Sequence, residues 1–160
     1  NLPAKDKMTP AHYQGITADR IAEVPLPDGA GRVRVIAGAL DGRQGPAATY
    51  TPMNVWDVRL AAGHAAELPQ PEGWTTLVLV QAGTVQVNGQ AAGAGQLVTL
   101  GRKGSGLRVQ AGGEDARLLL LAGEPIDEPV VGYGPFVMNS QQEIAEAISD
   151  FNSGKFGRMG

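Results

Sequence analysis

The sequence has no cysteine and only two histidines, and each of these two shortages excludes a class of chemistry. Without cysteine the chain can form no disulfide, thiolate nucleophile or sulfur-based metal site. This suits a reducing compartment, so a cytoplasmic location is expected. Two histidines are also too few for the convergent imidazole and carboxylate ligands of a catalytic metal centre. We therefore expect no metal site, catalytic residue or cofactor-binding residue in this chain.

The chain also has a small net charge, few charged residues and no long apolar run. Charged residues make up 18% of the sequence and the net charge is -3, so no basic surface indicates nucleic acid or acidic lipid as a partner. The longest apolar runs, such as residues 118–122, are too short to span a bilayer, and residues 1–8 have no apolar signal core. We expect a soluble chain that binds neither nucleic acid directly nor a membrane.

The length of 160 residues fits one compact domain. The chain begins at Asn1 without an initiator methionine, and residues 1–7 have the composition of a linker. We interpret the sequence as a fragment of a longer protein.

Glycine and proline, 23 and 11 residues, are spread between short apolar stretches, which is typical of an all-β domain with many turns. In residues 55–60, Trp56, Val58 and Leu60 alternate with polar residues, which predicts a strand with one buried face. Residues 75–81 and 84–87 flank Ala82-Gly83, which predicts a hairpin, and Asn88-Gly89 predicts the next turn. Further strands are predicted over residues 33–37, 96–100, 107–110 and 116–121.

The last part of the chain changes to a helical pattern. Ser140 and Glu143 form a capping box, and Ser153-Gly154 ends the pattern. Apolar residues recur at helical spacing between these limits, at Ile144, Ala147, Ile148 and Phe151. The sequence therefore predicts an antiparallel β-sandwich or barrel followed by one amphipathic helix.

The two histidines are the first candidates for metal ligands. His12 lies in the linker-like start, and His64 follows a predicted strand three residues before Glu67. Even together, His64 and Glu67 supply only two ligands, so a solvated turn is the better interpretation. The carboxylate pairs at Asp127-Glu128 and Glu114-Asp115 lie beside glycine or proline and are also interpreted as solvated turns.

The Gly-rich run of residues 101–106 contains Arg102 and Lys103 and could hold an anion, but it does not match a phosphate-binding loop. A positively charged turn is the simpler interpretation. Ser105 lacks the Gly-x-Ser-x-Gly context of a nucleophile elbow. Trp56 is expected to be a core anchor, and Trp74, which follows a turn, is expected to be partly exposed.

Several stretches together resemble the C-terminal half of pirin-family proteins. They are KDKMTPAHYQ (5–14), TPMNVWDVRL (51–60), GEPI (123–126), GYGPFVMNS (132–140) and SGKFG (153–157). Pirins are bicupins, and the resemblance implies a jelly-roll-like cupin barrel for this chain. It also implies that iron, or another divalent metal, is held by three histidines and a glutamate in a separate N-terminal barrel.

The resemblance assigns no metal ligand to this chain. A metal-bearing cupin has a His-x-His pair before a glutamate and a further histidine in its second motif. The matching residues 63–67 contain one histidine and residues 95–101 contain none. The resemblance therefore implies the metal-free second barrel of the pair.

We expect an interdomain linker remnant at residues 1–15, the cupin barrel at residues 16–135, and the C-terminal helix and tail at residues 136–160. The leading hypothesis is a metal-free domain that supports an absent metal-binding cupin, its expected partner. One alternative is that the domain shapes the substrate cavity of a quercetin 2,3-dioxygenase. Another is that it binds a regulatory protein. The supporting role predicts exposed apolar surface around Phe136 and Phe151.

Overall fold

The computed structural model describes residues 1–156 and divides the chain into two compact units. The barrel unit is Tyr13–Pro125, and the terminal unit combines Asn1–His12 with the chain from Ile126 onward. The domain boundaries expected after residues 15 and 135 stay predictions; the compact units of the structure divide the chain after residues 12 and 125. No helix among the described residues is both long enough and apolar enough to cross a membrane.

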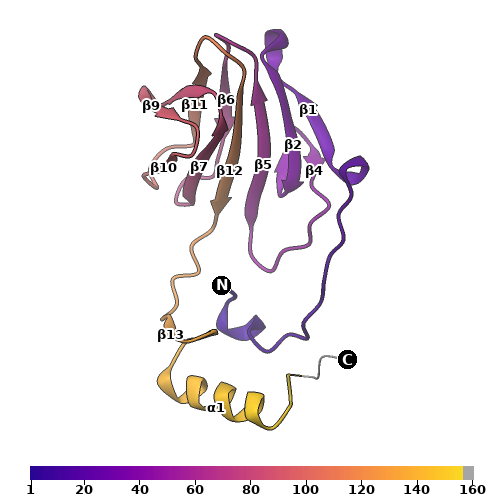
Figure 1. Ribbon diagram of the computed structural model, residues 1–160, viewed down its shortest axis with the longest axis vertical. Helices are drawn as coiled ribbons and strands as arrows, with labels where there is room; N and C mark the ends of the chain where they lie inside the picture. Colours follow the sequence, from indigo (N-terminus) through magenta and orange to yellow (C-terminus); the bar gives the residue numbers. More distant parts are fainter. Residues whose placement is uncertain (157–160) are drawn as a thin grey trace. The chain divides into compact units, whose positions relative to one another are not determined.

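The barrel unit consists of two main antiparallel sheets (Figure 1). The larger sheet has the order β1-β2-β5-β12-β7-β10, with bounds Ala22–Pro25, Gly31–Ala37, Met53–Leu60, Ala116–Gly123, Thr75–Ala82 and Leu97–Leu100. The smaller has the order β6-β11-β8-β9, with bounds Ala65–Pro69, Gly106–Ala111, Thr84–Val87 and Gln90–Gly93. A short hairpin, β3 (Ala39–Leu40) with β4 (Arg43–Gln44), and two 3-10 turns, Ala18–Arg20 and Pro27–Gly29, complete this unit.

The terminal unit contains a 3-10 turn at Ala4–Asp6, the hairpin of β13 (Val131–Tyr133) with β14 (Phe136–Met138), and the helix α1 (Gln141–Asn152). Segments from before and after the barrel unit meet in it, because the Ala4 amide donates to Glu128 Oε2 at 2.6 Å and Lys7 Nζ donates to the Val137 carbonyl at 3.3 Å. The predicted all-β antiparallel fold with one C-terminal helix is confirmed.

The core of the barrel unit is made by inward-facing residues of both sheets. Trp56, Val58 and Leu60 on β5 are each at most 2% exposed, as their alternation with polar residues predicts. Leu68 on β6 and Val109 on β11 bring the opposite sheet to the same core cluster. The face of β5 that points away from this core is therefore free to carry other side chains.

The hairpin predicted around Ala82-Gly83 is wrong. Strand β7 pairs with β12 and β10 in the larger sheet, whereas β8 pairs with β11 and β9 in the smaller one. Gly83, with φ of 77°, carries the chain from one sheet to the other. A Cβ atom at Gly83 would lie 2.6 Å from the Asp115 carbonyl oxygen, so the crossing requires a residue without a side chain. The turn predicted at Asn88-Gly89 is confirmed, since it joins β8 to β9 with both residues at positive φ.

The helix begins where the capping box predicts. Ser140 Oγ accepts a hydrogen bond from the Glu143 amide at 3.2 Å, and Glu143 Oε2 accepts one from the Asn139 amide at 2.8 Å. Ile144 and Ala147 form the buried face of α1. The first bond satisfies an amide that the first helical turn leaves without an intrahelical acceptor, and the second ties Asn139, the residue before the N-cap, to the same turn.

Replacing Ser140 by alanine is expected to destabilise α1 by about 1 kcal/mol, because the cap acceptor is lost. Amide hydrogen exchange along the helix would measure the change. Ser149→Ala is the control, since Ser149 is exposed within α1 and alanine is the better helix former. Equal exchange rates in wild type and Ser140→Ala would show that the cap contributes nothing.

Candidate functional site

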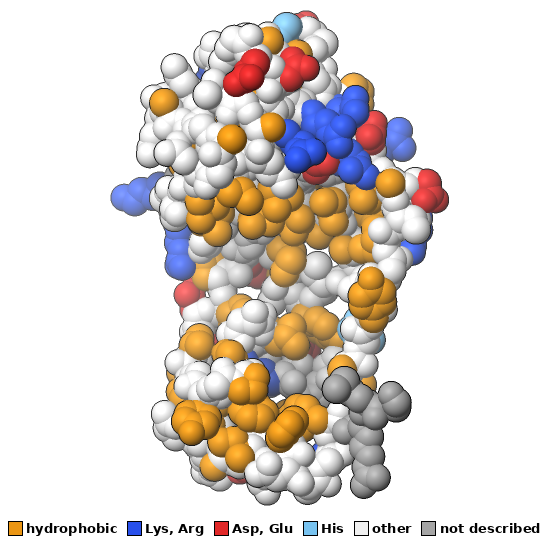
Figure 2. Space-filling view, in the orientation of Figure 1, with side chains coloured by type: hydrophobic (Ala, Val, Ile, Leu, Met, Phe, Trp, Pro, Cys, Tyr) orange, Lys and Arg blue, Asp and Glu red, His pale blue; other side chains and the backbone are white. Residues whose placement is uncertain are grey.

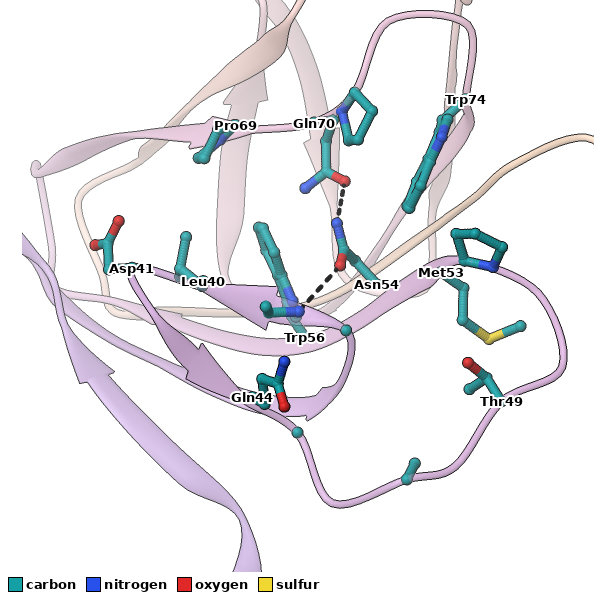
Figure 3. Close-up of a pocket in the computed structure, with 16 residues that line it drawn as sticks. Leu40, Asp41, Gln44, Thr49, Met53, Asn54, Trp56, Pro69, Gln70 and Trp74 are labelled. Carbon is teal, nitrogen blue, oxygen red and sulfur yellow. Dashed lines mark hydrogen bonds between the residues drawn. The ribbon is translucent and has the colours of Figure 1, made fainter.

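A pocket of about 730 Å³ in the barrel unit is the candidate site. Its walls come from three segments that meet beside the core (Figure 3): the β3-β4 hairpin, the start of β5, and the end of β6 with the turn after it. The side chains that define it are Leu40, Asp41, Gln44, Met53, Asn54, Trp56, Gln70 and Trp74. The volume is in the range of pockets that bind small organic molecules.

A chain of hydrogen-bonded amides lies along one wall of the pocket. The backbone amide of Ala39 donates to Asn54 Oδ1 at 3.4 Å, and Asn54 Nδ2 donates to Gln70 Oε1 at 2.9 Å (Figure 3). Asn54 and Gln70 are 8% and 6% exposed. Gln70 is held in place from its backbone as well, because its amide donates to the Ser105 carbonyl at 3.0 Å.

Gly38 allows the Asn54 amide to lie against the backbone of the preceding segment. Its φ is 75°, and a Cβ atom at this position would overlap both Asn54 Oδ1 and the Met53 carbonyl oxygen. A side chain at residue 38 would therefore displace the Asn54 side-chain amide, which positions Gln70 through its hydrogen bond.

Asn54→Ala is expected to lower the free energy of unfolding by about 1–3 kcal/mol, because it leaves the buried Gln70 Oε1 and the partly buried Ala39 amide without their partner. Denaturant unfolding would measure it. Gln14→Ala is the matched control: Gln14 makes two bonds to Ala48, of 2.9 and 2.8 Å, in an exposed setting where water can replace them. Equal losses in the two variants would contradict a buried network.

The donor set of the pocket does not suit a catalytic metal. Asp41 is the one ionisable residue among those that line it; the other polar side chains are amides, a hydroxyl and two indoles. Iron and similar metals prefer imidazole nitrogen with carboxylate oxygen. Across residues 1–156 there is no group of three or more histidine, cysteine, aspartate or glutamate side chains placed to hold a metal ion.

His64 and Glu67 do not enter the pocket. The His64 ring lies 3.0 Å from the Ala62 carbonyl oxygen and is exposed, as a solvated turn residue would be. Glu67 lies on β6, a strand that the sequence did not predict, on the face opposite the buried Ala66 and Leu68. It pairs instead with Arg108 at 3.1 Å.

The remaining candidates are His12, the loop of residues 101–106 and the two tryptophans, and their surroundings fit structural roles. His12 Nδ1 lies 3.4 Å from the Pro10 carbonyl oxygen in the terminal unit. The Gly-rich loop of residues 101–106 is exposed, and the Gly104 backbone amide donates a hydrogen bond to Glu72 Oε1 at 3.3 Å. Trp56 is buried and Trp74 is half-buried, as expected.

The interpretation of Glu128 as part of a solvated turn is wrong. It is half-buried, and its Oε2 accepts from the Ala4 amide and, at 3.1 Å, from Asn139 Nδ2. It joins the start of the chain to the hairpin region of the terminal unit. The sequence offered no signal for this role, because the partners are 124 and 11 residues away.

Asn54 and Gln70 were not predicted from the sequence. A signal for Asn54 was present, since it occupies an inward position in the alternation of Trp56, Val58 and Leu60. A polar residue on a buried strand face needs a hydrogen-bonding partner. That partner, Gln70, lies beyond the next strand and could not be found from local pattern.

Comparison with known proteins identifies the family of the chain. The family model of the pirin C-terminal cupin domain matches residues 55–157. The chain belongs to the pirin family. A Pseudomonas aeruginosa protein named a putative quercetin 2,3-dioxygenase is 48% identical over 158 residues, which cover 99% of this chain and 55% of that protein. Rat pirin is 37% identical over 166 residues, which cover all of this chain and 56% of the relative.

A solved structure of quercetin 2,3-dioxygenase from Acinetobacter baumannii superposes on this pirin-family chain with a TM-score of 0.91 and 45% identity, covering 100% of this chain and 56% of that one. The predicted cupin-type fold and the predicted family are confirmed. The pirin-family chain thus spans about half the length of the relatives it matches.

Proposed function

We propose that this pirin-family domain supports a metal-bearing cupin domain by packing an apolar sheet face against it. The observation that carries the proposal is the outer face of the six-stranded sheet. In most antiparallel sheets one face packs on the core and the other is wet and polar. Here both faces of the central strands are apolar, as in β12, where Leu118 and Leu120 point inward while Leu119 and Leu121 point outward.

The outward residues align across the sheet. Val55, Leu121 and Leu77 are cross-strand neighbours on β5, β12 and β7. One step along the strands, Leu119, Leu79 and Leu97 form the next row on β12, β7 and β10. We call these six residues the apolar sheet face. Figure 2 shows hydrophobic side chains gathered in a band on the barrel unit.

Charged residues border the apolar sheet face at one end. Asp57, directly opposite Leu119, pairs with Arg34 at 3.3 Å and Arg59 at 3.5 Å. Asp57 Oδ1 and Arg59 Nε are buried and have no hydrogen-bond partner. An apolar centre with a polar border is typical of a protein interface.

The terminal unit adds a second exposed apolar surface. Phe151 is 60% exposed and Val137 is 45% exposed, while Phe136 is half-buried and makes edge contacts with Phe151 and Phe156. Complete burial of Phe136 and Phe151 would have argued against a docking role. Neither side chain is completely buried, which supports that role.

The test measures binding between this chain and a partner segment. The partner segment is the part of the Pseudomonas aeruginosa relative that the chain does not match. Titration calorimetry with the 160-residue chain is expected to show saturable binding. Leu121→Asp should weaken it at least about tenfold, the size of a central interface substitution. Leu97→Asp is a second variant that folding should tolerate, since Leu97 is already 55% exposed.

Gln110→Asp is the matched control, because Gln110 is exposed on β11 of the smaller sheet. It should bind like the wild type. No binding by the wild-type chain, or equal binding by Leu97→Asp and wild type, would overturn the supporting role.

A second candidate function, completion of the substrate cavity of a quercetin 2,3-dioxygenase, is favoured by the activity named for the Acinetobacter baumannii structure. Quercetin consumption would be followed with iron and the partner segment, in the presence and absence of this chain. Turnover that requires the chain supports this function, and its absence despite binding would reject it.

A further inference from the structure

Three arginines lie side by side on the outer face of the larger sheet. Arg59 on β5 is directly opposite Arg32 on β2 and Arg117 on β12. We call these three residues the arginine row. They are far apart in the sequence, so only the pairing of the strands brings them together. We propose that the arginine row binds the phosphate group of a small organic phosphate, independently of any docking role of the domain.

The arginine row points away from the core of the barrel unit. The residue that follows each arginine along its strand is at most 2% exposed, so the arginine itself points outward. The side chains of Arg32 and Arg59 are 47% and 41% exposed, and Arg117 is exposed as well. Figure 2 shows Lys and Arg side chains gathered on the barrel unit, beside its band of hydrophobic side chains. A ligand can therefore reach the arginines from solvent.

A hollow of about 530 Å³ is lined by all three arginines. Ala61 and Ala82 are among its other walls, and their small side chains leave room between the arginines. Asp115 is the one carboxylate in the lining, and its Oδ1 already accepts a hydrogen bond from the Ala62 amide at 2.9 Å. The lining therefore carries an excess of positive charge, which favours an anion.

The carboxylates in the next row of the sheet do not neutralise the arginine row. Glu23 and Asp57 each lie 3.3–3.7 Å from one of its arginines, but each is shared with Arg34. Arg117 forms no ion pair with any residue in the described range 1–156. Like charges directly opposite each other on neighbouring strands destabilise a sheet. A bound anion would remove this repulsion.

A phosphate group suits the arginine row better than a carboxylate does. The planar guanidinium group pairs with phosphate oxygens through two parallel hydrogen bonds. Neighbouring strands are about 4.8 Å apart, so arginines from three adjacent strands can converge on an anion above the middle one. A phosphate monoester offers them three terminal oxygens and is largely a dianion at neutral pH, whereas a carboxylate offers two oxygens and one charge.

The surroundings favour a small phosphate over an extended polyanion. Glu23 and Asp57 lie in the row beside the arginine row, and Leu119 continues that row into the apolar sheet face. A nucleic acid requires a continuous basic stripe, which these residues interrupt. The volume of the hollow is in the range of sites for small organic molecules.

The test compares methyl phosphate with methyl sulfate, which has a similar tetrahedral group and one negative charge less at about pH 7.5. Nitrogen-15 spectra of the arginine Nε–H groups follow the binding, and Arg117→Gln assigns the Arg117 signal. Methyl phosphate is expected to shift this signal in a saturable way. It should bind at least about threefold more tightly than methyl sulfate, within the range of one additional exposed charge pair. Sodium chloride at the same ionic strength should give no saturable shift.

Arg117→Gln should weaken the binding of methyl phosphate at least about threefold, followed at the backbone amides of β5, because one of three guanidinium groups is lost. Folding should tolerate it, since Arg117 is exposed. Arg108→Gln is the matched control: it changes the net charge equally, but Arg108 lies on β11 of the smaller sheet and pairs with Glu67. It should bind like the wild type. If the ligand-free spectrum of Arg117→Gln differs from that of the wild type throughout the sheet, Arg32→Gln replaces it.

Equal affinity of the wild type for methyl phosphate and methyl sulfate would overturn the proposal. So would equal weakening in the row variant and in Arg108→Gln, which would indicate attraction by net charge alone. The absence of a saturable shift of the Arg117 signal, up to the solubility of methyl phosphate, would reject the site altogether.

Discussion

Trp56→Ala is expected to lower the free energy of unfolding by about 3–5 kcal/mol, the usual cost of removing a buried large aromatic side chain. Trp56 is 1% exposed at the centre of β5 and belongs to the core cluster built by both sheets. Its loss leaves a cavity that rigid β-strands on either side, β2 and β12, cannot close. Denaturant unfolding followed by circular dichroism would measure the change.

Trp74→Ala is the matched control, because it removes the same side chain from a half-buried position after a turn. Its cost should be clearly smaller, since less apolar surface is lost and the site remains open to solvent. Equal costs for the two substitutions would contradict the assignment of Trp56 as the core anchor.

Gly38→Ala is expected to cost about 2–5 kcal/mol, from two sources. Alanine at a positive φ costs about 1–2 kcal/mol, and the overlap with Asn54 Oδ1 and the Met53 carbonyl adds about 1–3 kcal/mol of overpacking. The substitution should also weaken the hydrogen bond between Asn54 and Gln70, which nitrogen-15 spectra of the side-chain amides would report.

Gly42→Ala separates the two sources. Gly42 has the same φ of 75°, and a Cβ atom added there would meet no other atom within 4 Å, so only the backbone cost applies. The difference between the two variants therefore measures the close approach of Gly38 to Asn54. If the two costs are the same, that approach does not constrain the site.

Five of the six strands of the larger sheet were predicted because their patterns are local, whereas β1 was not predicted. Residues 55–60 carry the pattern within themselves, and the helix carries its start signal at Ser140 and Glu143. The path of the chain at Gly83 was not predictable, because a glycine between two apolar runs serves a hairpin and a crossing between sheets equally well. Only the pairing of β7 with β12, far along the chain, distinguishes them.

The candidate site, like the path of the chain at Gly83, was only partly predictable from local sequence. The shortage of metal ligands followed from a count of histidines, without any geometry. The pocket depends on the pairing of Asn54 with Gln70 and on the passage of the backbone at Gly38. Strand β6 was missed because Ala65-Ala66-Glu67 has weak strand propensity, and its place in the sheet comes from pairing with β11.

The terminal unit, which joins segments from either side of the barrel unit, has a consequence for synthesis on the ribosome. The barrel unit is complete once residue 125 has emerged, whereas the amide of Ala4 must wait for Glu128, 124 residues later, to find its acceptor. Contacts this distant along the chain form late, because a long loop must close first. Residues 1–12 therefore reach their contacts in the terminal unit only after the whole barrel unit has been made, and a cut within them would weaken contacts to a hairpin and helix encoded far downstream in the message.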